Sequence, residues 1–289
     1  MEFSASADLS VIQLFVALGR LLSFSETDVH TLVAVFTRVG AVVGLLPGFG
    51  ERAIPARVRL AAAIAFTAIV WPVLTPGLGE DGPATAGTGP IGGADSSALI
   101  PFSLGRLLLA EAAVGLMLGI AIRMLLWAMQ FAGSIAAQAT SVLQIFGSGA
   151  TPDPMPAIGN LLTIAAITVA LVGDLHIKAS LVMIGSYEVL PLGVFPIAGD
   201  LAEWGVARAA AAFGLAFSLA APFLILGLVY NIALGAISRA MPQLMVVLIG
   251  APAIVAISIL LLMLAAPVML THWSGALDAT LADPFGLPR

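Results

Sequence analysis

The chain has 289 residues, of which 60% are hydrophobic and only 9% are charged, with a net charge of −5. Because a soluble domain carries about 25% charged residues, this composition excludes a surface that faces water throughout. The absence of cysteine excludes disulfides, thiolate metal sites and a cysteine nucleophile. We therefore predict an all-α, polytopic membrane protein with about six long apolar helices and a re-entrant segment.

The first apolar stretches predict two membrane spans. Residues 9–24 are apolar but short, and we expect an interfacial or packed helix there. Residues 29–50 form the first plausible span and contain Arg38. Residues 57–75 form the second, and at about 1.5 Å per residue they reach about 28 Å, close to the hydrocarbon thickness of about 30 Å.

The middle of the chain changes character twice. Residues 76–98 are rich in Gly, Pro, Ser, Thr and Ala and predict a flexible, solvated loop. Residues 101–146 are apolar for longer than one span, so we expect a break near Arg123, with a span at 104–122 and a re-entrant or pore-lining segment after it. That second segment carries a polar stripe, which favours a cavity or a protein neighbour over lipid: Gln130, Ser134, Gln138, Ser141 and Gln144.

The second half predicts three further helical stretches. Residues 157–190 form one, broken near Gly173-Asp174, where Asp174 and Lys178 are spaced to pair on one helix face. After a loop at 191–205, two long apolar helices at 206–237 and 244–270 are joined by a tight turn. Residues 271–289 form a polar tail.

Basic residues predict the orientation of these helices, because cytoplasmic loops carry an excess of Lys and Arg. We expect three turns to face the cytoplasm and the acidic loops 76–98 and 191–205 to face outward, which six crossings satisfy. The basic residues of these turns are Arg52, Arg57 and Arg59 after the first span, Arg123 after the third, and Arg239 in the last turn.

Two charges lie inside predicted spans. Arg38 and Glu111 both fall several residues into spans that run inward, so they reach comparable depth. A lone Arg at a helix centre costs about 2.5–3.5 kcal/mol on insertion scales, and pairing offsets part of that cost. The pattern predicts a buried ion pair that fixes helix register. A proton or ion relay, and side chains reaching to opposite interfaces, are the alternatives.

A stretch rich in glycine and proline follows the polar-striped segment. Leu143, Ile145 and Phe146 are bulky and apolar, and Gly147 and Gly149 come directly after them. Flanked by glycines, these side chains can swing as a unit and form a hydrophobic constriction that gates a pore by excluding water. The alternative is a plain surface loop with a helix cap at Gly147.

No pattern of catalytic residues occurs. The three histidines lie far apart, and no nucleotide-binding loop or nucleophile motif is present. We therefore expect no enzymatic activity, no cofactor, no metal and no nucleic-acid partner.

Three segments carry a resemblance to a known family. They are FTRVGAVVGLLPGFGERAIPARVRLAAAIA at 36–65, LLLAEAAVGLMLGIAIRMLLWAMQFAGSIAAQ at 107–138, and NIALGAISRAMPQLMVVLIGAPAIVAISILLLM at 231–263. They resemble the FliR family of flagellar biosynthesis proteins and its counterpart in injectisome type III secretion. The resemblance covers residues 29 to about 270, and the GSIAAQ and GFGER stretches favour the flagellar branch.

The resemblance implies an assembly and a location. One such subunit joins FliP-like and FliQ-like subunits in an export gate of the bacterial inner membrane, within the flagellar basal body, and unfolded flagellar proteins pass through. Residues 1–205 are then similar to a P-type subunit, and 206–270 to a Q-type hairpin. The turn with Arg239, Pro242 and Gln243 is expected to meet the export platform protein on the cytoplasmic side.

The resemblance also implies a plug at 138–156. It assigns closure to Leu143, Ile145 and Phe146 and hinges to Gly147 and Gly149, with Met155 in the same loop. This chain departs from the aromatic-rich stretch of its relatives, because it has Ser-Gly-Ala-Thr-Pro-Asp-Pro-Met-Pro there. An injectisome gate subunit is one alternative function. A stand-alone secondary transporter, with Arg38 and Glu111 in its path, is the other.

Overall fold

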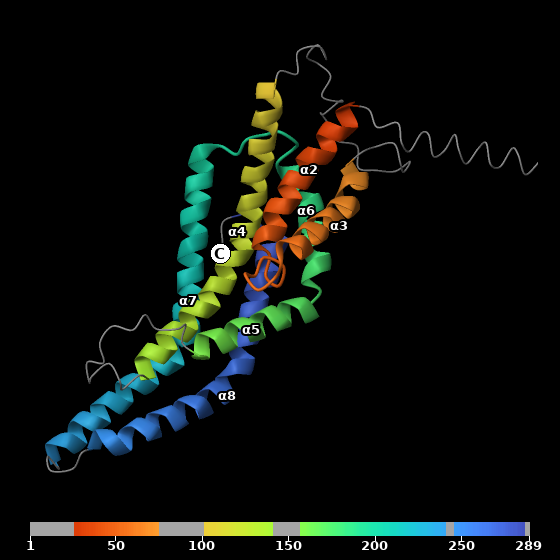
Figure 1. Cartoon of the computed structure of the whole chain (residues 1–289). Coiled ribbons are helices and arrows are strands. Elements are labelled where there is room, and N and C mark those ends of the chain that lie inside the picture. The colour runs from red at the N-terminus through yellow and green to blue at the C-terminus, as the bar shows by residue number, and fades with distance from the viewer. Residues whose placement is uncertain (1–25, 75–100, 141–156, 241–245, 287–289) are drawn as a thin grey trace, which may run out of the picture.

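The computed structural model describes four ranges of the chain, which are residues 26–74, 101–140, 157–240 and 246–286. Every regular element in these ranges is an α-helix, so the prediction of an all-α polytopic chain is confirmed (Figure 1). The helix predicted at 9–24 and the loop predicted at 76–98 lie outside the described residues.

Two helices come first in the described part of the chain. Helix α2 (Glu26–Leu45) and helix α3 (Ala56–Leu74) correspond to the first two predicted spans. Helix α2 ends just before Pro47, which lacks the N–H group that would continue the helix. The turn that joins the two helices contains the sequence Gly-Phe-Gly-Glu-Arg. Its Glu51 lies beside the helix that carries Arg123, because the two side chains are hydrogen-bonded.

Helix α4 (Pro101–Thr140) is the long central helix, against which α2, α5, α7 and α8 all pack (Figure 1). The predicted break near Arg123 is wrong, because α4 runs unbroken through that position, and no re-entrant segment begins there. Arg123, the charge that suggested a break, is paired with another side chain instead: its Nη1 donates to Glu51 Oε1 at 2.6 Å. Because no proline or glycine lies between Gly119 and Gly133, nothing else interrupts the helix.

Helices α5 (Ala157–Val172) and α6 (Leu175–Val189) form a bent pair at 71°, which confirms the predicted break near Gly173-Asp174. Asp174 adopts a left-handed backbone conformation with φ 58°. The predicted pairing of Asp174 with Lys178 is wrong, because Lys178 Nζ donates to Asp278 of α8 at 2.7 Å. Asp174 is the N-cap residue of α6, and its backbone oxygen accepts the N–H of Lys178 at 3.0 Å.

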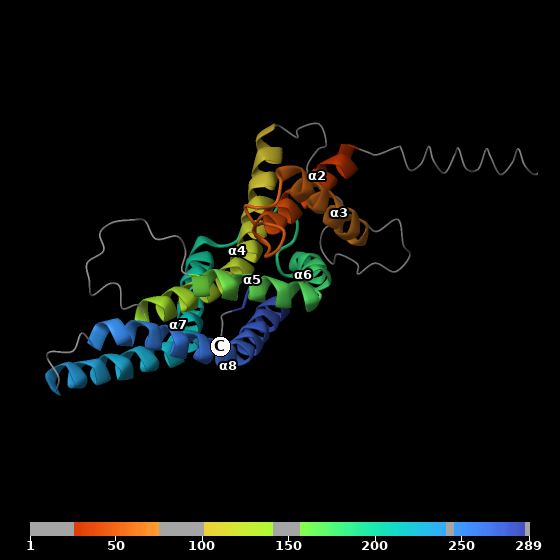
Figure 2. The same ribbon diagram turned by 60° about the horizontal axis from the view of Figure 1, so that its bottom comes forward.

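Helices α7 (Ala198–Ala240) and α8 (Val246–Ala282) form a long hairpin that projects from the body (Figure 2). The expectation of a polar tail from residue 271 is wrong as far as Ala282, because α8 continues to that residue. Trp273, Leu277 and Leu281 recur every fourth position there and are buried, so they extend one apolar helix face. The expected boundary at 205 falls inside α7, and the division into two parts stays a prediction.

Four of the described helices are long and apolar enough to cross a membrane, and the bent α5–α6 pair makes a fifth. Helix α2 adds a shorter apolar stretch, Val29–Leu45. Together these elements make up the six apolar helical units that the sequence predicted, with α5 and α6 counted as one.

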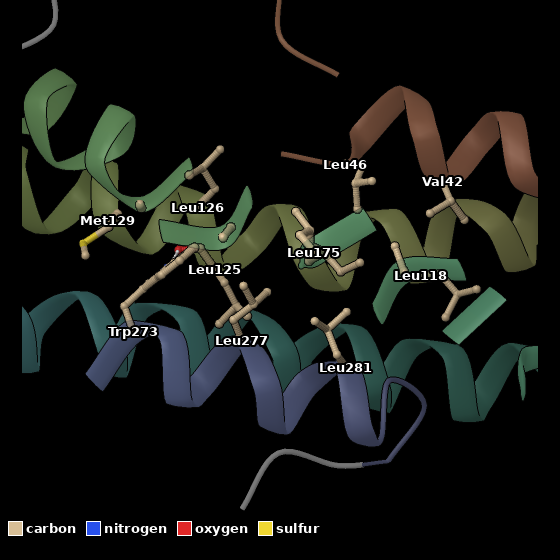
Figure 3. Close-up of a cluster of buried hydrophobic side chains, with 14 of the residues drawn as sticks. Val42, Leu46, Leu118, Leu125, Leu126, Met129, Leu175, Trp273, Leu277 and Leu281 are labelled. Carbon is tan, nitrogen blue, oxygen red and sulfur yellow. Dashed lines mark hydrogen bonds between the residues drawn. The ribbon is translucent and has the colours of Figure 1, made fainter. Parts of the chain in front are cut away.

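The main core lies along α4, where side chains of α2, α6 and α8 meet it (Figure 3). Trp273 of α8 is fully buried in this core and donates from Nε1 to the backbone oxygen of Leu125 at 2.8 Å. This contact fixes the C-terminal half of α8 against the centre of α4.

Replacing Trp273 with Ala should remove this anchor. Truncating a fully buried tryptophan costs about 3–5 kcal/mol, so we expect a clear fall in the midpoint of thermal unfolding in detergent. His272→Ala is the control, because the neighbouring side chain is exposed. Equal midpoints for the two variants would show that α8 is not held through this residue.

Candidate functional site

The most elaborate polar site in the described part of the chain is a buried ion pair between α2 and α4. Arg38 and Glu111 are both 0% exposed. Arg38 Nε donates to Glu111 Oε2 at 2.7 Å, and Arg38 Nη2 donates to Glu111 Oε1 at 3.1 Å. The structure therefore brings together the two intramembrane charges of the sequence in a two-pronged contact, which is the strongest geometry for such a pair.

Helix α6 and the segment after it complete this site. Arg38 Nη1 donates to Ser186 Oγ at 3.0 Å, and Nη2 also donates to the backbone oxygen of Leu190 at 3.0 Å. Glu111 accepts the backbone N–H of Gly193 at 2.9 Å and the Tyr187 hydroxyl at 3.4 Å. The Arg38 guanidinium also lies 3.7 Å from the centroid of the Tyr187 ring. We call these residues the Arg38–Glu111 cluster.

Small residues allow the two charged side chains to meet. At Gly115, one turn beyond Glu111 on α4, an added Cβ would collide with the backbone oxygen of Arg38. At Gly119, one turn further along, it would lie 2.8 Å from Leu45 Cβ. This G-x-x-x-G face therefore lets the backbones of α2 and α4 approach closely, so that the Arg38 and Glu111 side chains can contact each other directly.

The contacts of the cluster determine what it can do chemically. Every nitrogen of the Arg38 guanidinium donates, and both Glu111 oxygens accept two hydrogen bonds each. A buried pair with this many hydrogen bonds offsets much of its desolvation cost, and the partners named here use four of the five guanidinium N–H groups. The arrangement therefore suits a fixed connection among α2, α4 and α6.

A second place of interest is the base of the loop between α4 and α5. The predicted plug residues Leu143, Ile145, Phe146, Gly147, Gly149 and Met155 lie outside the described residues. The helix ends that carry the loop are described, and they are tightly packed. At Gly133 of α4 an added Cβ would collide with Gly159 of α5, and at Gly227 of α7 it would collide with Ala139 of α4. The loop therefore begins and ends on helices that touch.

The basic turns are placed as follows. Arg52 and Arg57 are exposed, and Arg59 is half-buried with its Nη2 donating to the backbone oxygen of Ile54 at 3.3 Å. Arg239 is exposed at the end of α7, whereas Pro242 and Gln243 lie outside the described residues.

These turns are far apart along the hairpin. The pairing of Trp273 with Leu125 puts the start of α8, at Val246, about 40 Å along that helix from the level of Arg123. The turn with Arg239 and the arginines near Arg123 can therefore lie at the same membrane surface only if the hairpin lies in the plane of that surface. The expectation that all of them face the cytoplasm stays a prediction.

Sequence reasoning missed a group of contacts at the end of α8. Arg208 of α7 donates to Thr280 Oγ1 at 3.2 Å and to the backbone oxygens of Asp283 and Gly286 at 2.8 Å each. It therefore caps the carbonyl end of α8, as a cation at that end favours. The available signal was Arg208 itself, after which α7 carries no further charge before Arg239.

Metal chemistry has no support in the described ranges. No three His, Cys, Asp or Glu side chains there lie close enough together to hold a metal ion.

Residues 29–280 match a family described as bacterial export proteins, family 1. The flagellar biosynthetic protein FliR of Caulobacter vibrioides is 29% identical over 250 residues, which cover 86% of this chain and 92% of that protein. FliR of Pectobacterium carotovorum is 28% identical over 86% of this chain and 90% of its own length. FliR of Escherichia coli is 25% identical over 227 residues, which cover 78% of this chain and 80% of that protein. The resemblance to the FliR family that the sequence segments indicated is confirmed.

The buried pair predicts an asymmetric response to substitution. Glu111→Ala leaves the Arg38 charge buried without its partner, and we expect a loss of about 3–5 kcal/mol in stability. The double variant Arg38→Met/Glu111→Leu buries no charge and should recover most of that loss. Thermal unfolding of the purified chain in detergent measures both.

Glu188→Ala is the matched control, because this glutamate on α6 is exposed. A double variant as unstable as Glu111→Ala, or a Glu111→Ala variant as stable as the control, would contradict the role of the pair.

Proposed function

The chain belongs to the bacterial export proteins of family 1, and on this premise we propose that it is a subunit of the flagellar protein export gate. In that role it forms part of the conduit through which unfolded flagellar proteins cross the inner membrane at the flagellar basal body. It catalyses no covalent reaction and acts by shape, packing and closure.

The observation that carries this proposal is the apolar surface of α7. Its exposed aliphatic side chains run from Val206, which is 72% exposed, to Ile237, which is 45% exposed. These residues lie about 47 Å apart along the helix, whereas the hydrocarbon core is about 30 Å thick. Helix α7 also contains Pro222 and bends along its length (Figure 1), so one straight crossing of a bilayer does not take in the whole of this surface. Lipid alone therefore does not cover this surface, and neighbouring protein chains supply the rest.

These neighbours are, in our proposal, FliP-like and FliQ-like subunits. Residues 1–205 contact them as a P-type subunit does, and residues 206–270 contact them as a Q-type hairpin does. The exposed apolar face of the α7–α8 hairpin supplies the contact area. The turn at Arg239, Pro242 and Gln243 faces the platform protein, because its exposed Arg239 ends the long uncharged part of α7.

Closure of the conduit is assigned to the loop between α4 and α5. Its base is held by the Gly133–Gly159 and Gly227–Ala139 contacts, so both of its ends stay in fixed positions. The half-exposed polar side chains of Gln130 and Ser134 lead along α4 toward it. With a rigid base, Leu143, Ile145 and Phe146 block the path, and Gly147 and Gly149 allow them to move aside. Met155 lies near the end of the same loop.

A stand-alone secondary transporter is the second candidate, and it is less well supported. Such a transporter would need Arg38 or Glu111 to be free for a substrate or a proton, whereas the hydrogen bonds of the cluster occupy both side chains. An injectisome gate would use the same architecture. The flagellar role is favoured because the relatives with matching sequence are flagellar proteins.

Photo-crosslinking tests whether protein covers α7 along its length. A photoreactive residue in place of Val206, and separately of Ile232, should crosslink this chain to other membrane polypeptides near both ends of the helix. The same residue at buried Ala216 is the control and should give no such products. Crosslinks to lipid alone at both exposed positions would exclude the gate subunit and favour the transporter.

The plug proposal has its own test. Deleting residues 147–151 should shorten the closure segment and let small ions leak, measured as membrane conductance and slower growth. Deletion of residues 85–89, in the loop predicted at 76–98, is the control of equal length and should leave conductance unchanged. Wild-type conductance in the first deletion, with normal assembly, would show that this loop does not seal the path.

A further inference from the structure

We propose that the arginine turn between α2 and α3, formed by Arg52, Arg57 and Arg59, is a binding site for the phosphate headgroup of an anionic phospholipid. This proposal does not depend on the export role. It concerns the attachment of the chain itself to the surrounding membrane.

The turn concentrates positive charge in a chain that has little of it. Together with Arg123, its arginines make up four of the 11 Lys and Arg residues of the chain, although the net charge is −5. The acid in the turn, Glu51, is already paired with Arg123. Arg52 and Arg57 make no ion pair or hydrogen bond within the described ranges, and the Arg59 Nε atom is buried without a partner. An anion from outside the chain would complete this site.

Local electrostatics point in the same direction. Arg57 lies in the first turn of α3, and Arg59 follows it, while no acidic residue is present in that turn. Cations at a helix N-terminus oppose the helix dipole and destabilise the helix when they are alone. Arginines at this helix N-terminus are unfavourable by themselves, so we expect a negatively charged partner there. A bound phosphate would interact favourably with both the arginines and the helix dipole.

The level of the turn in the molecule matches a membrane surface. Helix α3 extends from it for 19 residues, about 28 Å, and carries no further charge after Arg59. On the opposite side, the hairpin extends about 40 Å along α8 from Trp273 to Val246, which equals a bilayer with its headgroups. Whether α3 or the hairpin spans the bilayer, this geometry puts the arginine turn, at the start of α3, at headgroup depth in our proposal.

The rest of α3 explains why the ligand is a lipid and not a small anion. Its exposed large side chains beyond the arginines are aliphatic and include Leu60, Ile64 and Ile69. These residues offer an apolar surface to acyl chains directly beside the guanidinium groups. A phospholipid contacts the arginines through its phosphate and the aliphatic face of α3 through its acyl chains, whereas inorganic phosphate contacts only the arginines.

The test is a titration of the full-length chain in detergent with phosphatidylglycerol, followed by native mass spectrometry. Arg52→Gln/Arg57→Gln should bind this lipid about 30-fold more weakly, since each arginine near a membrane surface contributes a factor of about five. Arg52→Lys/Arg57→Lys keeps the charge and should keep most of the affinity. Arg59 is left unchanged because it bonds to the backbone of the turn.

Arg106→Gln is the matched control, because Arg106 is another exposed arginine, placed near the start of α4. Its affinity for phosphatidylglycerol should equal that of the unchanged chain. Equal binding of phosphatidylcholine, or full competition by inorganic phosphate at equal concentration, would overturn the proposal of an anionic lipid. Unchanged lipid affinity in the Gln double variant would overturn it too, and loss of a co-purified acidic protein in that variant would assign the arginines to a protein partner.

Discussion

The buried contact between Arg38 and Glu111 constrains the arrangement of the N-terminal half. Two charges that are 0% exposed are tolerated only when their hydrogen bonds are complete. That requirement fixes the depth of α2 against α4, because the atoms must meet at 2.7 Å. It also positions α6, whose Ser186 and Tyr187 contact the pair, together with Leu190 and Gly193 in the segment after that helix. A shift of one helical turn in α2 or α4 would leave a buried charge without its partner, and the same shift in α6 would remove the hydroxyl contacts of Ser186 and Tyr187.

The C-terminal half uses a different constraint on the same central helix. Trp273 joins α8 to the middle of α4, and Arg208 caps the end of α8 from α7. These contacts hold the part of the hairpin nearest the body, and the rest projects from it (Figure 2). The projecting part has exposed apolar side chains, such as Ile232 and Ile257. The chain thus combines an internally hydrogen-bonded half with a long exposed apolar surface, which is the surface that the proposed gate assembly would cover.

Apolar patterning made the helical class and most helix positions predictable, and the pairing of Arg38 with Glu111 followed from their comparable depth in two spans. The unbroken α4 was missed because Arg123 resembled a surface charge, and its partner Glu51 lies 72 positions away. The helical end of α8 was missed because polar residues there obscured the four-residue spacing of Trp273, Leu277 and Leu281. Contacts of Ser186, Tyr187 and Arg208 depend on tertiary packing, which one sequence does not reveal.

The central claim is that this chain works as one subunit among different partners, and the mass of the intact complex tests it most directly. A tagged chain would be extracted from its own host in mild detergent and weighed by native mass spectrometry. We expect a large complex with unequal copies of two other small membrane proteins. A monomer or a symmetric homo-oligomer, found repeatedly in several detergents, would contradict it.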